Sequence, residues 1–267
     1  MKRTFIFFKR NLTECLRDPI VYIFCAAFPV LMLILFAVIN ACVPTPQATF
    51  EYTSLLPGIL SFGFTFVMLL LGLLVSKDRS TAFLKRLYAS PLKNEEFIFG
   101  YAILGIAVGI IQGVISLFAG YILSLITGGE YFSFARACQL LLSELPMLFI
   151  CVFSGILFGV IMNDKTAPAI TSVFISASGI LGGAWMPLDT MGGFETICRF
   201  LPFYPSVYIG RIITGASHSV TDYANPVREL YVFDNIALLG IIPIVIFLVL
   251  SIFSACFSFS KKRQAAT

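Results

Sequence analysis

The sequence predicts an all-α membrane protein with six transmembrane helices. Three observations lead to this fold class. Of the 267 residues, 58% are hydrophobic and only 12% are charged, about half the charged share of a soluble domain. The apolar residues gather into six runs that are long enough to cross a bilayer. The lysines and arginines between these runs lie mostly on one side of the predicted membrane, which gives the chain an orientation.

Residues 1–20 are expected to form an amphipathic helix along the membrane surface. Basic residues alternate there with apolar ones that gather broadly on one helical side. Asp18-Pro19 should end this helix and turn the chain into the bilayer, because proline disfavours helical backbone at the preceding residue. The first span, 21–41, contains no charge, and Pro29 within it predicts a kink.

The second and third spans, 59–75 and 97–126, flank a charged segment that must lie in water at one membrane face. Residues 77–92 of this segment fit a short amphipathic helix that a soluble partner could contact. Its apolar side consists of Phe83, Leu84, Leu87 and Tyr88. The pattern fits a helix that rests on lipid headgroups equally well.

The ends of this short helix carry their own signals. Asp78, Ser80 or Thr81 would cap its start, because each offers a side-chain oxygen to unpaired backbone N–H groups. Ser90-Pro91 would end it, since proline clashes with a continuing helix.

Glycines recur at four-residue spacing in the third span and in the fourth, 139–162. This spacing lets another helix backbone approach closely, so we expect these residues to pack helices together, within the subunit or across a dimer. They are Gly105, Gly109, Gly113, Gly155 and Gly159. Glu144 lies near the start of the fourth span, where an interfacial or helix-pairing role is favoured over a proton relay.

The fifth span is expected at 166–185 and the last at 236–257. Between them, glycines and prolines interrupt the apolar pieces of residues 182–207, none of which is long enough to cross. We expect two short helices that dip into the membrane from outside and return. Residues 208–235 are expected to form a polar loop.

The distribution of positive charge orients the chain. Fourteen of the eighteen lysines and arginines lie in the N-terminal segment, residues 77–96, the turn at 163–166 and the C-terminus, and four lie on the other side. Because positively charged loops stay in the cytoplasm, both termini and residues 77–92 are expected there, with the protein in the plasma membrane.

The sequence lacks the usual catalytic and nucleotide-binding motifs. It contains no GxSxG, no HExxH and no Walker A loop. Its seven cysteines and single histidine lack the spacing of a metal site. We therefore expect no metal, no cofactor on this chain and no nucleic-acid partner. The central membrane is nearly free of charge, unlike that of most secondary transporters.

Three motifs resemble the ABC-2 type permeases, the membrane subunits of ATP-binding-cassette exporters. One is the family's acidic-x-Gly-Thr…Ser-Pro motif, matched by Asp78, Thr81, Phe83, Leu84, Ser90, Pro91 and Leu92. Ser80 stands where the family often has glycine, and Asp78 where glutamate is commoner. The others are Arg17-Asp18-Pro19 before a proline-containing span, and GGAWMPL followed by RFLPFYP, beginning at Gly182 and Arg199.

The resemblance implies a single membrane domain over residues 1–267 in an exporter of two permease and two ATPase subunits, with ATP on the ATPase. Residues 77–92 would be the coupling helix that seats in the ATPase, through Asp78, Thr81, Phe83, Leu84, Leu87, Tyr88, Ser90 and Pro91. Residues 182–207 would form the outer gate, with Gly182, Gly183, Trp185, Pro187, Pro202 and Pro205. The path would follow the second and fifth spans, past Phe62, Phe64, Phe66, Phe174 and Trp185.

The substrate expected for such a chain is an amphipathic or lipid-like compound of the drug or antibiotic type, moved outward past membrane lipid. A polysaccharide or teichoic-acid exporter is the alternative, because it would use the same fold at a similar length. An intramembrane transferase would need polar residues around one cavity, whereas Glu144, Asp164 and His218 lie in separate segments. A non-transporting assembly or sensor subunit is a further alternative.

Overall fold

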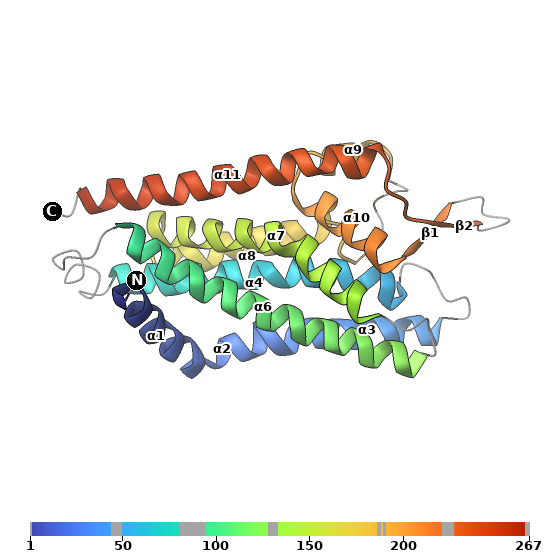
Figure 1. The fold of residues 1–267 in the computed structure, drawn as a ribbon, viewed down its shortest axis with the longest axis horizontal. Coiled ribbons are helices and arrows are strands. Elements are labelled where there is room, and N and C mark those ends of the chain that lie inside the picture. The colour runs from blue at the N-terminus through green and yellow to red at the C-terminus, as the bar shows by residue number, and fades with distance from the viewer. Residues whose placement is uncertain are drawn as a thin grey trace.

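The computed structural model describes residues 2–43, 50–80, 94–127, 133–185, 188, 191–220 and 227–264. Long helices lie side by side in an elongated bundle (Figure 1). The N-terminus and the end of the last helix lie at one end of the bundle, here called the termini end. A β-hairpin lies at the other, the hairpin end.

The elements follow one another in the order α1 (Lys2–Arg17), α2 (Pro19–Val21), the π-helical turn η1 (Tyr22–Ala27), α3 (Phe28–Cys42), α4 (Tyr52–Ser80), α6 (Asn94–Thr127), α7 (Phe134–Ile161), α8 (Thr166–Leu181), α9 (Gly193–Cys198), α10 (Phe203–Thr214), β1 (Ser217–Val220), β2 (Val227–Leu230) and α11 (Asn235–Gln264).

The predicted all-α membrane fold is confirmed, with five helices in the described part of the chain that are long and apolar enough to cross a membrane. They are Tyr22–Cys42, Tyr52–Ser80, Glu95–Thr127, Phe134–Ile161 and Asn235–Ser260. The fifth predicted span, 166–185, is the shorter helix α8, which ends at Leu181 after 16 residues. At 1.5 Å per residue α8 is about 24 Å long, less than the ~30 Å of a bilayer core. It ends because the chain turns at Gly182 and Gly183, and Gly183 has a φ of +62°.

The break predicted at Asp18-Pro19 separates α1 from α2. Phe7, Asn11 and Cys15 form a buried stripe at helical spacing on α1, and this helix packs mainly against α6. The kink predicted at Pro29 takes the form of the π-helical turn Tyr22–Ala27 directly before it. Proline has no N–H to offer the carbonyl one turn earlier, and the backbone widens where that bond is missing.

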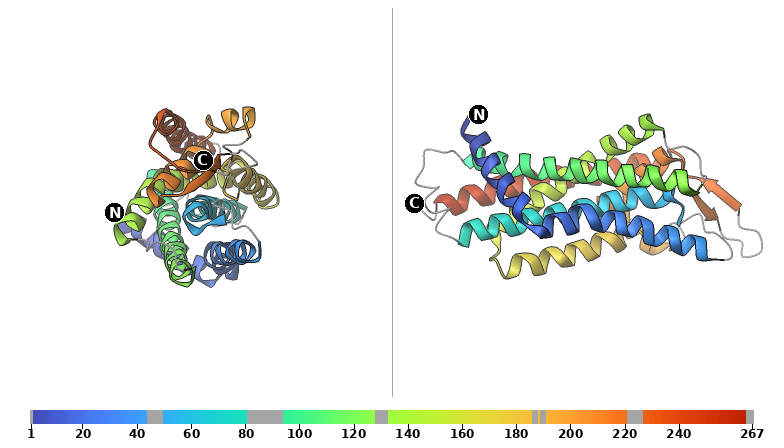
Figure 2. Two further views of the ribbon diagram at one scale, coloured as in Figure 1. Left: turned by 90° about the vertical axis from the view of Figure 1, so that its right-hand side faces the viewer. Right: turned by 90° about the horizontal axis from the view of Figure 1, so that it is seen from below.

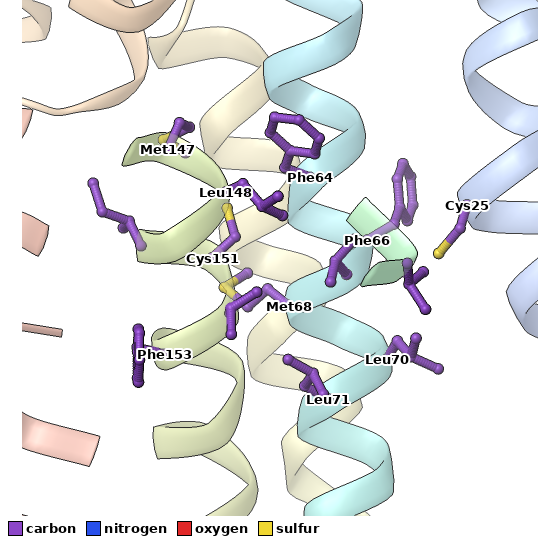
Figure 3. Close-up of a cluster of buried hydrophobic side chains, with 14 of the residues drawn as sticks. Cys25, Phe64, Phe66, Met68, Leu70, Leu71, Met147, Leu148, Cys151 and Phe153 are labelled. Carbon is purple, nitrogen blue, oxygen red and sulfur yellow. The ribbon is translucent and has the colours of Figure 1, made fainter. Parts of the chain in front are cut away.

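Helix α4 is the centre of the bundle. In its most apolar window 89% of the residues are buried, against 22% in the corresponding window of α11. The other helices surround it in the end-on view of Figure 2. Its most extensive contact is with α7, where Met68 and Leu71 of α4 lie beside Leu148 and Cys151 of α7 (Figure 3).

The expectation of a polar loop over 208–235 is wrong. Helix α10 continues to Thr214, and β1 and β2 then form an antiparallel hairpin in which Ser217 pairs with Leu230 and Val220 with Val227. Helix α10 is followed by Gly215, whose φ of +71° is a left-handed conformation that favours glycine. The polar composition of this stretch concealed both elements, because α10 buries polar side chains and the hairpin is short.

Candidate functional site

At the termini end, α1 is bound to the last turn of α4 by an arginine–carboxylate pair. Arg10 Nη1 and Nη2 donate to the two oxygens of Asp78 at 2.7 and 2.9 Å. The Tyr101 hydroxyl of α6 donates to the same carboxylate at 2.7 Å. Burial lowers the pKa of Arg10, but its hydrogen bond to Asp78 and the nearby negative charges raise it by more, so this pKa lies above the usual value. Three elements therefore meet at one buried carboxylate.

Aromatic packing supports this contact. The Phe7 ring of α1 lies edge-on to the rings of Phe97 and Tyr101 in α6, with centroids 5.5 and 5.0 Å away. Gly100 makes room for it, because a Cβ at Gly100 would lie 2.4 Å from the Phe7 ring. The apolar stripe of α1 and the polar pair thus fix the same helix against α4 and α6.

The opposite side of the last turn of α4 is joined to α7. Arg79 donates to the Val160 carbonyl, near the C-terminus of α7, and to Asn163 Oδ1 at 2.8 Å. The carbonyls at a helix C-terminus carry partial negative charge, which favours a cation there. Asp78 and Arg79 therefore connect the end of α4 to α1 and α6 on one side and to α7 on the other.

A polar groove opens beside the Arg10–Asp78 pair. Glu14 bridges two cations across it, with Arg10 at 2.7 Å and Lys77 at 3.3 Å. The groove has a volume of about 640 Å³ and is lined by Arg10, Thr13, Glu14, Arg17, Asp18, Pro19 and Lys77.

The structure places Asp78 differently from the sequence-based expectation. Helix α4 continues through Ser80, so Asp78 lies within α4 and does not cap a separate helix. It is buried against Arg10 and Tyr101 and is not available as a surface contact. The other predicted coupling residues, Thr81, Phe83, Leu84, Leu87, Tyr88, Ser90 and Pro91, lie outside the described residues.

At the hairpin end, helix α10 is bound to the first turns of α4. Arg211 Nε donates to the Ser54 carbonyl at 3.2 Å, and Nη2 donates to the Gly183 carbonyl at 2.7 Å. The Thr214 hydroxyl donates to the Thr53 carbonyl at 2.6 Å. Arg211 is fully buried, and its guanidinium lies 5.7 Å from the centre of the Tyr231 ring.

Pro57 and Gly58 of α4 make this contact possible. Pro57 has no N–H for the Thr53 carbonyl one turn earlier, so that carbonyl is free to accept from Thr214. Gly58 lets the predicted gate segment approach closely, because a Cβ there would lie 2.5 Å from the Ala184 carbonyl oxygen. The sequence of α4 thus shapes the surface on which α10 and residue 184 lie.

Helix α10 is also joined to α7. The Ser206 hydroxyl donates to Glu144 Oε2 at 2.7 Å, and both residues are buried. Glu144, for which the sequence favours a helix-pairing role, therefore contacts α10 through this hydrogen bond. The three polar residues considered for an enzyme lie apart: Asp164 borders α1 and Lys77 at the termini end, and His218 packs on the Tyr231 ring at 4.7 Å.

The predicted gate residues lie in the segment between α8 and the hairpin. Trp185 packs on Phe36 and Phe62, with centroids 5.6 and 4.6 Å apart. Pro202 precedes the first residue of α10, and Pro205 contacts α11 so closely that a Cβ at Gly240 would lie 2.6 Å from it. Gly182 and Gly183 form the turn after α8, and Pro187 lies outside the described residues.

The short helix α9 is hydrogen-bonded to α10 within this segment. Arg199 donates to Glu195 Oε1 at 2.7 Å, and the Tyr204 hydroxyl donates to the same oxygen at 3.0 Å. Burial lowers the pKa of Arg199, but Glu195 raises it by more. Burial and the charge of Glu195 also raise the pKa of Cys198.

The five predicted packing glycines all lie at helix contacts within the chain. Cβ atoms added at Gly105, Gly109 and Gly113 of α6 would lie 2.2 to 2.7 Å from leucine methyl carbons of α4 or α7. At Gly155 and Gly159 of α7 they would lie within 3.0 Å of backbone carbonyl oxygens of α4. Of these five glycines, the two in α7 therefore bring the backbones of α4 and α7 close together.

The aromatic residues considered for the path do not share one face. Phe62 and Phe66 pack together with Phe28, whereas Phe64 is fully buried and approaches Gly113 of α6. Phe174 of α8 packs on Phe158 of α7.

Sequence reasoning did not single out Arg10, Tyr101, Ser206, Arg211 or Thr214. The available signals were Pro57-Gly58 at the start of an apolar run and an arginine within a stretch of apolar residues, Ile209 to Ile213. The described residues contain no group of three histidine, cysteine or acidic side chains that could hold a metal ion. The contacts described above join helices at the two ends of the bundle.

Comparison with known proteins gives one family. The family model described as ABC-2 type transporter matches residues 2–214, from α1 to the end of α10. No curated protein matches the chain.

Proposed function

The chain belongs to the ABC-2 type transporter family and is the membrane permease of an ABC transporter, and we propose that it exports an amphipathic or lipid-like compound. The family resemblance predicted from the sequence is thus confirmed. The family implies a partner subunit that binds ATP, and the sequence contains no Walker A loop of its own. We propose that ATP binds and is hydrolysed on that partner.

The observation that carries the proposal is the continuity of α4. This single helix of 29 residues reaches from the Arg211 and Thr214 contacts at the hairpin end to Asp78 and Arg79 at the termini end. At 1.5 Å per residue it is about 43 Å long. A push on the segment that follows Ser80 would therefore act on the residues that hold α10.

The orientation follows from charge. We propose that the termini end faces the cytoplasm of a plasma membrane, because the segments at this end hold fourteen of the eighteen lysines and arginines. The predicted gate segment then lies at the outer face. Helix α8 would complete a sixth crossing together with the turn that follows it, within a single domain over residues 1–267.

Surface composition supports lipid and a second permease as neighbours. Helices α3, α6 and α11 expose many large apolar side chains, as expected for surfaces that contact acyl chains or another subunit. An apolar groove of about 620 Å³ between α6 and α7 adds to this surface. An amphipathic substrate suits the same surroundings, since it partitions into the membrane before export.

Co-purification followed by an ATPase assay tests the function. Tagged permease from native membranes should carry an ATPase subunit. Leu84→Asp or Leu87→Asp should release it, because a charge on the apolar face of the proposed coupling helix is costly at a contact. Lys85→Gln, on the opposite side of that helix, is the matched control and should retain it. Recovery of the wild-type chain without any ATPase would refute the proposal.

A further inference from the structure

Two buried ionisable residues at the hairpin end, Arg211 and Glu144, are each only partly satisfied in this structure. We propose that Arg211 and Glu144 position α10 in two alternative arrangements: the contacts seen here, and a direct Arg211–Glu144 ion pair that forms when the outer segment moves during export. This inference rests on the proposed function, since it assigns the movement to the transport cycle.

Arg211 has more N–H donors than its surroundings offer acceptors. Its Nε and Nη2 donate to the carbonyls of Ser54 and Gly183, and its Nη1 has no hydrogen-bond partner among the described residues. Neutral carbonyls and the Tyr231 ring surround the guanidinium, and it forms none of the ion pairs in the described structure. Hydrogen bonds between two charged groups are stronger than those to neutral acceptors. A carboxylate within reach would therefore compete for Arg211.

Glu144 has the opposite shortage, since its carboxyl offers more acceptors than its surroundings offer donors. Its Oε2 accepts from Ser206, and the Ser61 hydroxyl of α4 lies near the same carboxyl, whereas Oε1 is buried and has no partner in good hydrogen-bond geometry among the described residues. The residue is fully buried in α7, and it too forms no ion pair there. A buried polar atom without a partner is costly, so the arrangement seen here leaves both side chains with something to gain.

The order of residues along α10 places Arg211 next to the face that contacts Glu144 of α7. Ser206 and Gly210 are one turn apart and face Glu144, and a Cβ at Gly210 would lie 3.2 Å from Glu144 Oε1. Arg211 is the next residue, about 100° further around the helix. A rotation of α10 of that order, or less given the length of an arginine side chain, would bring the guanidinium to the carboxylate.

At Gly210, α10 lies tightly against α4 and α7, because a Cβ there would lie 2.6 Å from the Pro57 Cβ and 3.1 Å from a methyl carbon of Leu140. The rotation therefore requires α10 to move away from Pro57 at the same time. The rotation would release the Ser54 and Gly183 carbonyls. It would thereby separate the outer segment from the first turns of α4, which is the movement an outer gate requires.

The single tryptophan of this chain reports on that separation. Trp185 lies two residues after Gly183, the Arg211 acceptor, and packs on Phe36 and Phe62. Its emission should shift to longer wavelength when the segment leaves α4. The measurement uses the complex with its ATPase in lipid nanodiscs, before and after trapping with ATP and vanadate. A Trp185→Phe complex is subtracted to remove the partner's emission.

The two positions should respond differently. Glu144→Gln should leave the resting emission of Trp185 unchanged, because an amide oxygen still accepts from Ser206, but should reduce the nucleotide-driven shift about tenfold. Arg211→Gln should move the resting emission toward the trapped value without nucleotide. Arg211→Lys should restore much of the resting state, and Lys165→Gln, a change of charge at an exposed position of the termini end, should behave as wild type.

The outcomes separate the inference from the function. A Glu144→Gln complex that keeps the full nucleotide-driven shift would overturn the exchange, as would a wild-type complex that hydrolyses ATP without any shift. If Arg211→Gln does not assemble, Glu144→Gln and Arg211→Lys still decide the question. A wild-type preparation without ATP hydrolysis would instead overturn the proposed function.

Discussion

The Arg10 guanidinium donates to both carboxylate oxygens of Asp78, at 2.7 and 2.9 Å, across 68 residues of sequence. This pair joins the N-terminal helix to the helix that leads into the proposed coupling segment. The Asp78 side chain is 3% exposed and that of Arg10 is 34% exposed, so the carboxylate depends on its partner more than the arginine does. Several expectations about stability and coupling rest on this and on the other contacts of the bundle.

Arg10→Ala should destabilise the protein by about 2–3 kcal/mol, because it leaves a buried carboxylate with only the Tyr101 hydroxyl among its partners described above. Thermal unfolding of the purified protein in detergent measures this. Arg17→Ala, on an exposed position of the same helix, should have little effect. The double variant Arg10→Ala/Asp78→Ala should be more stable than Arg10→Ala alone, and a double variant that is less stable would contradict the account.

Gly155→Ala should cost more stability than Gly109→Ala. The new Cβ at Gly155 would lie 2.6 Å from the Met68 carbonyl oxygen, and α4 cannot yield there without moving its backbone. At Gly109 it would lie 2.2 Å from a methyl carbon of Leu148, which can rotate away. We expect about 1–3 kcal/mol for Gly155→Ala and less for Gly109→Ala. Gly193→Ala is the control, since nothing lies within 4 Å of that position, and the reverse ranking in thermal unfolding would refute the packing argument.

Cys15 should react slowly with maleimide. Burial, and to a lesser extent the charge of Asp18, raise the pKa of its thiol from 9.0 to about 11. The reactive thiolate at pH 8 is therefore reduced roughly 100-fold, and it rises about tenfold with each pH unit up to about pH 11. Cys42 is exposed and serves as the reference within the same molecule. Mass spectrometry of labelled peptides measures both rates in the native protein, and equal rates at pH 8 would show that Cys15 is accessible.

The proposed orientation predicts opposite accessibility for two cysteines. Cys42 lies at the end of α3 near the hairpin end, and Arg17→Cys would place a thiol at the end of α1. In variants with one cysteine each, an impermeant maleimide should label Cys42 in intact cells. It should label Arg17→Cys only after the membrane is opened or inverted. The opposite pattern would reverse the topology.

Several features of the fold were readable from local sequence. The break at Asp18-Pro19, the disturbance before Pro29 and five of the six spans follow from residues that act on their own neighbours. The fifth span was predicted too long, because its hydrophobicity continues past the turn at Gly183. The hairpin was missed because a pair of four-residue strands carries too short a pattern to distinguish from a loop.

Less of the candidate site could be predicted from the sequence. The motif at 77–92 begins in the last turn of α4, but Asp78 was assigned to a separate helix. Its partners Arg10 and Tyr101 lie 68 and 23 residues away, and no local pattern links them. Glu144 was identified as an unusual residue, whereas its hydrogen bond to Ser206 spans 62 residues.

The sequence by itself determined the membrane class, the family, the breaks at prolines and the asymmetry of positive charge. These depend on composition and on interactions between residues close in the chain. The tertiary structure decided which side chains meet: Asp78 with Arg10, Arg211 with the carbonyls of Ser54 and Gly183, and Ser206 with Glu144. The reason is physical, since a buried polar group is satisfied by whichever partner packing brings to it, and that packing is set by how the helices lie against α4.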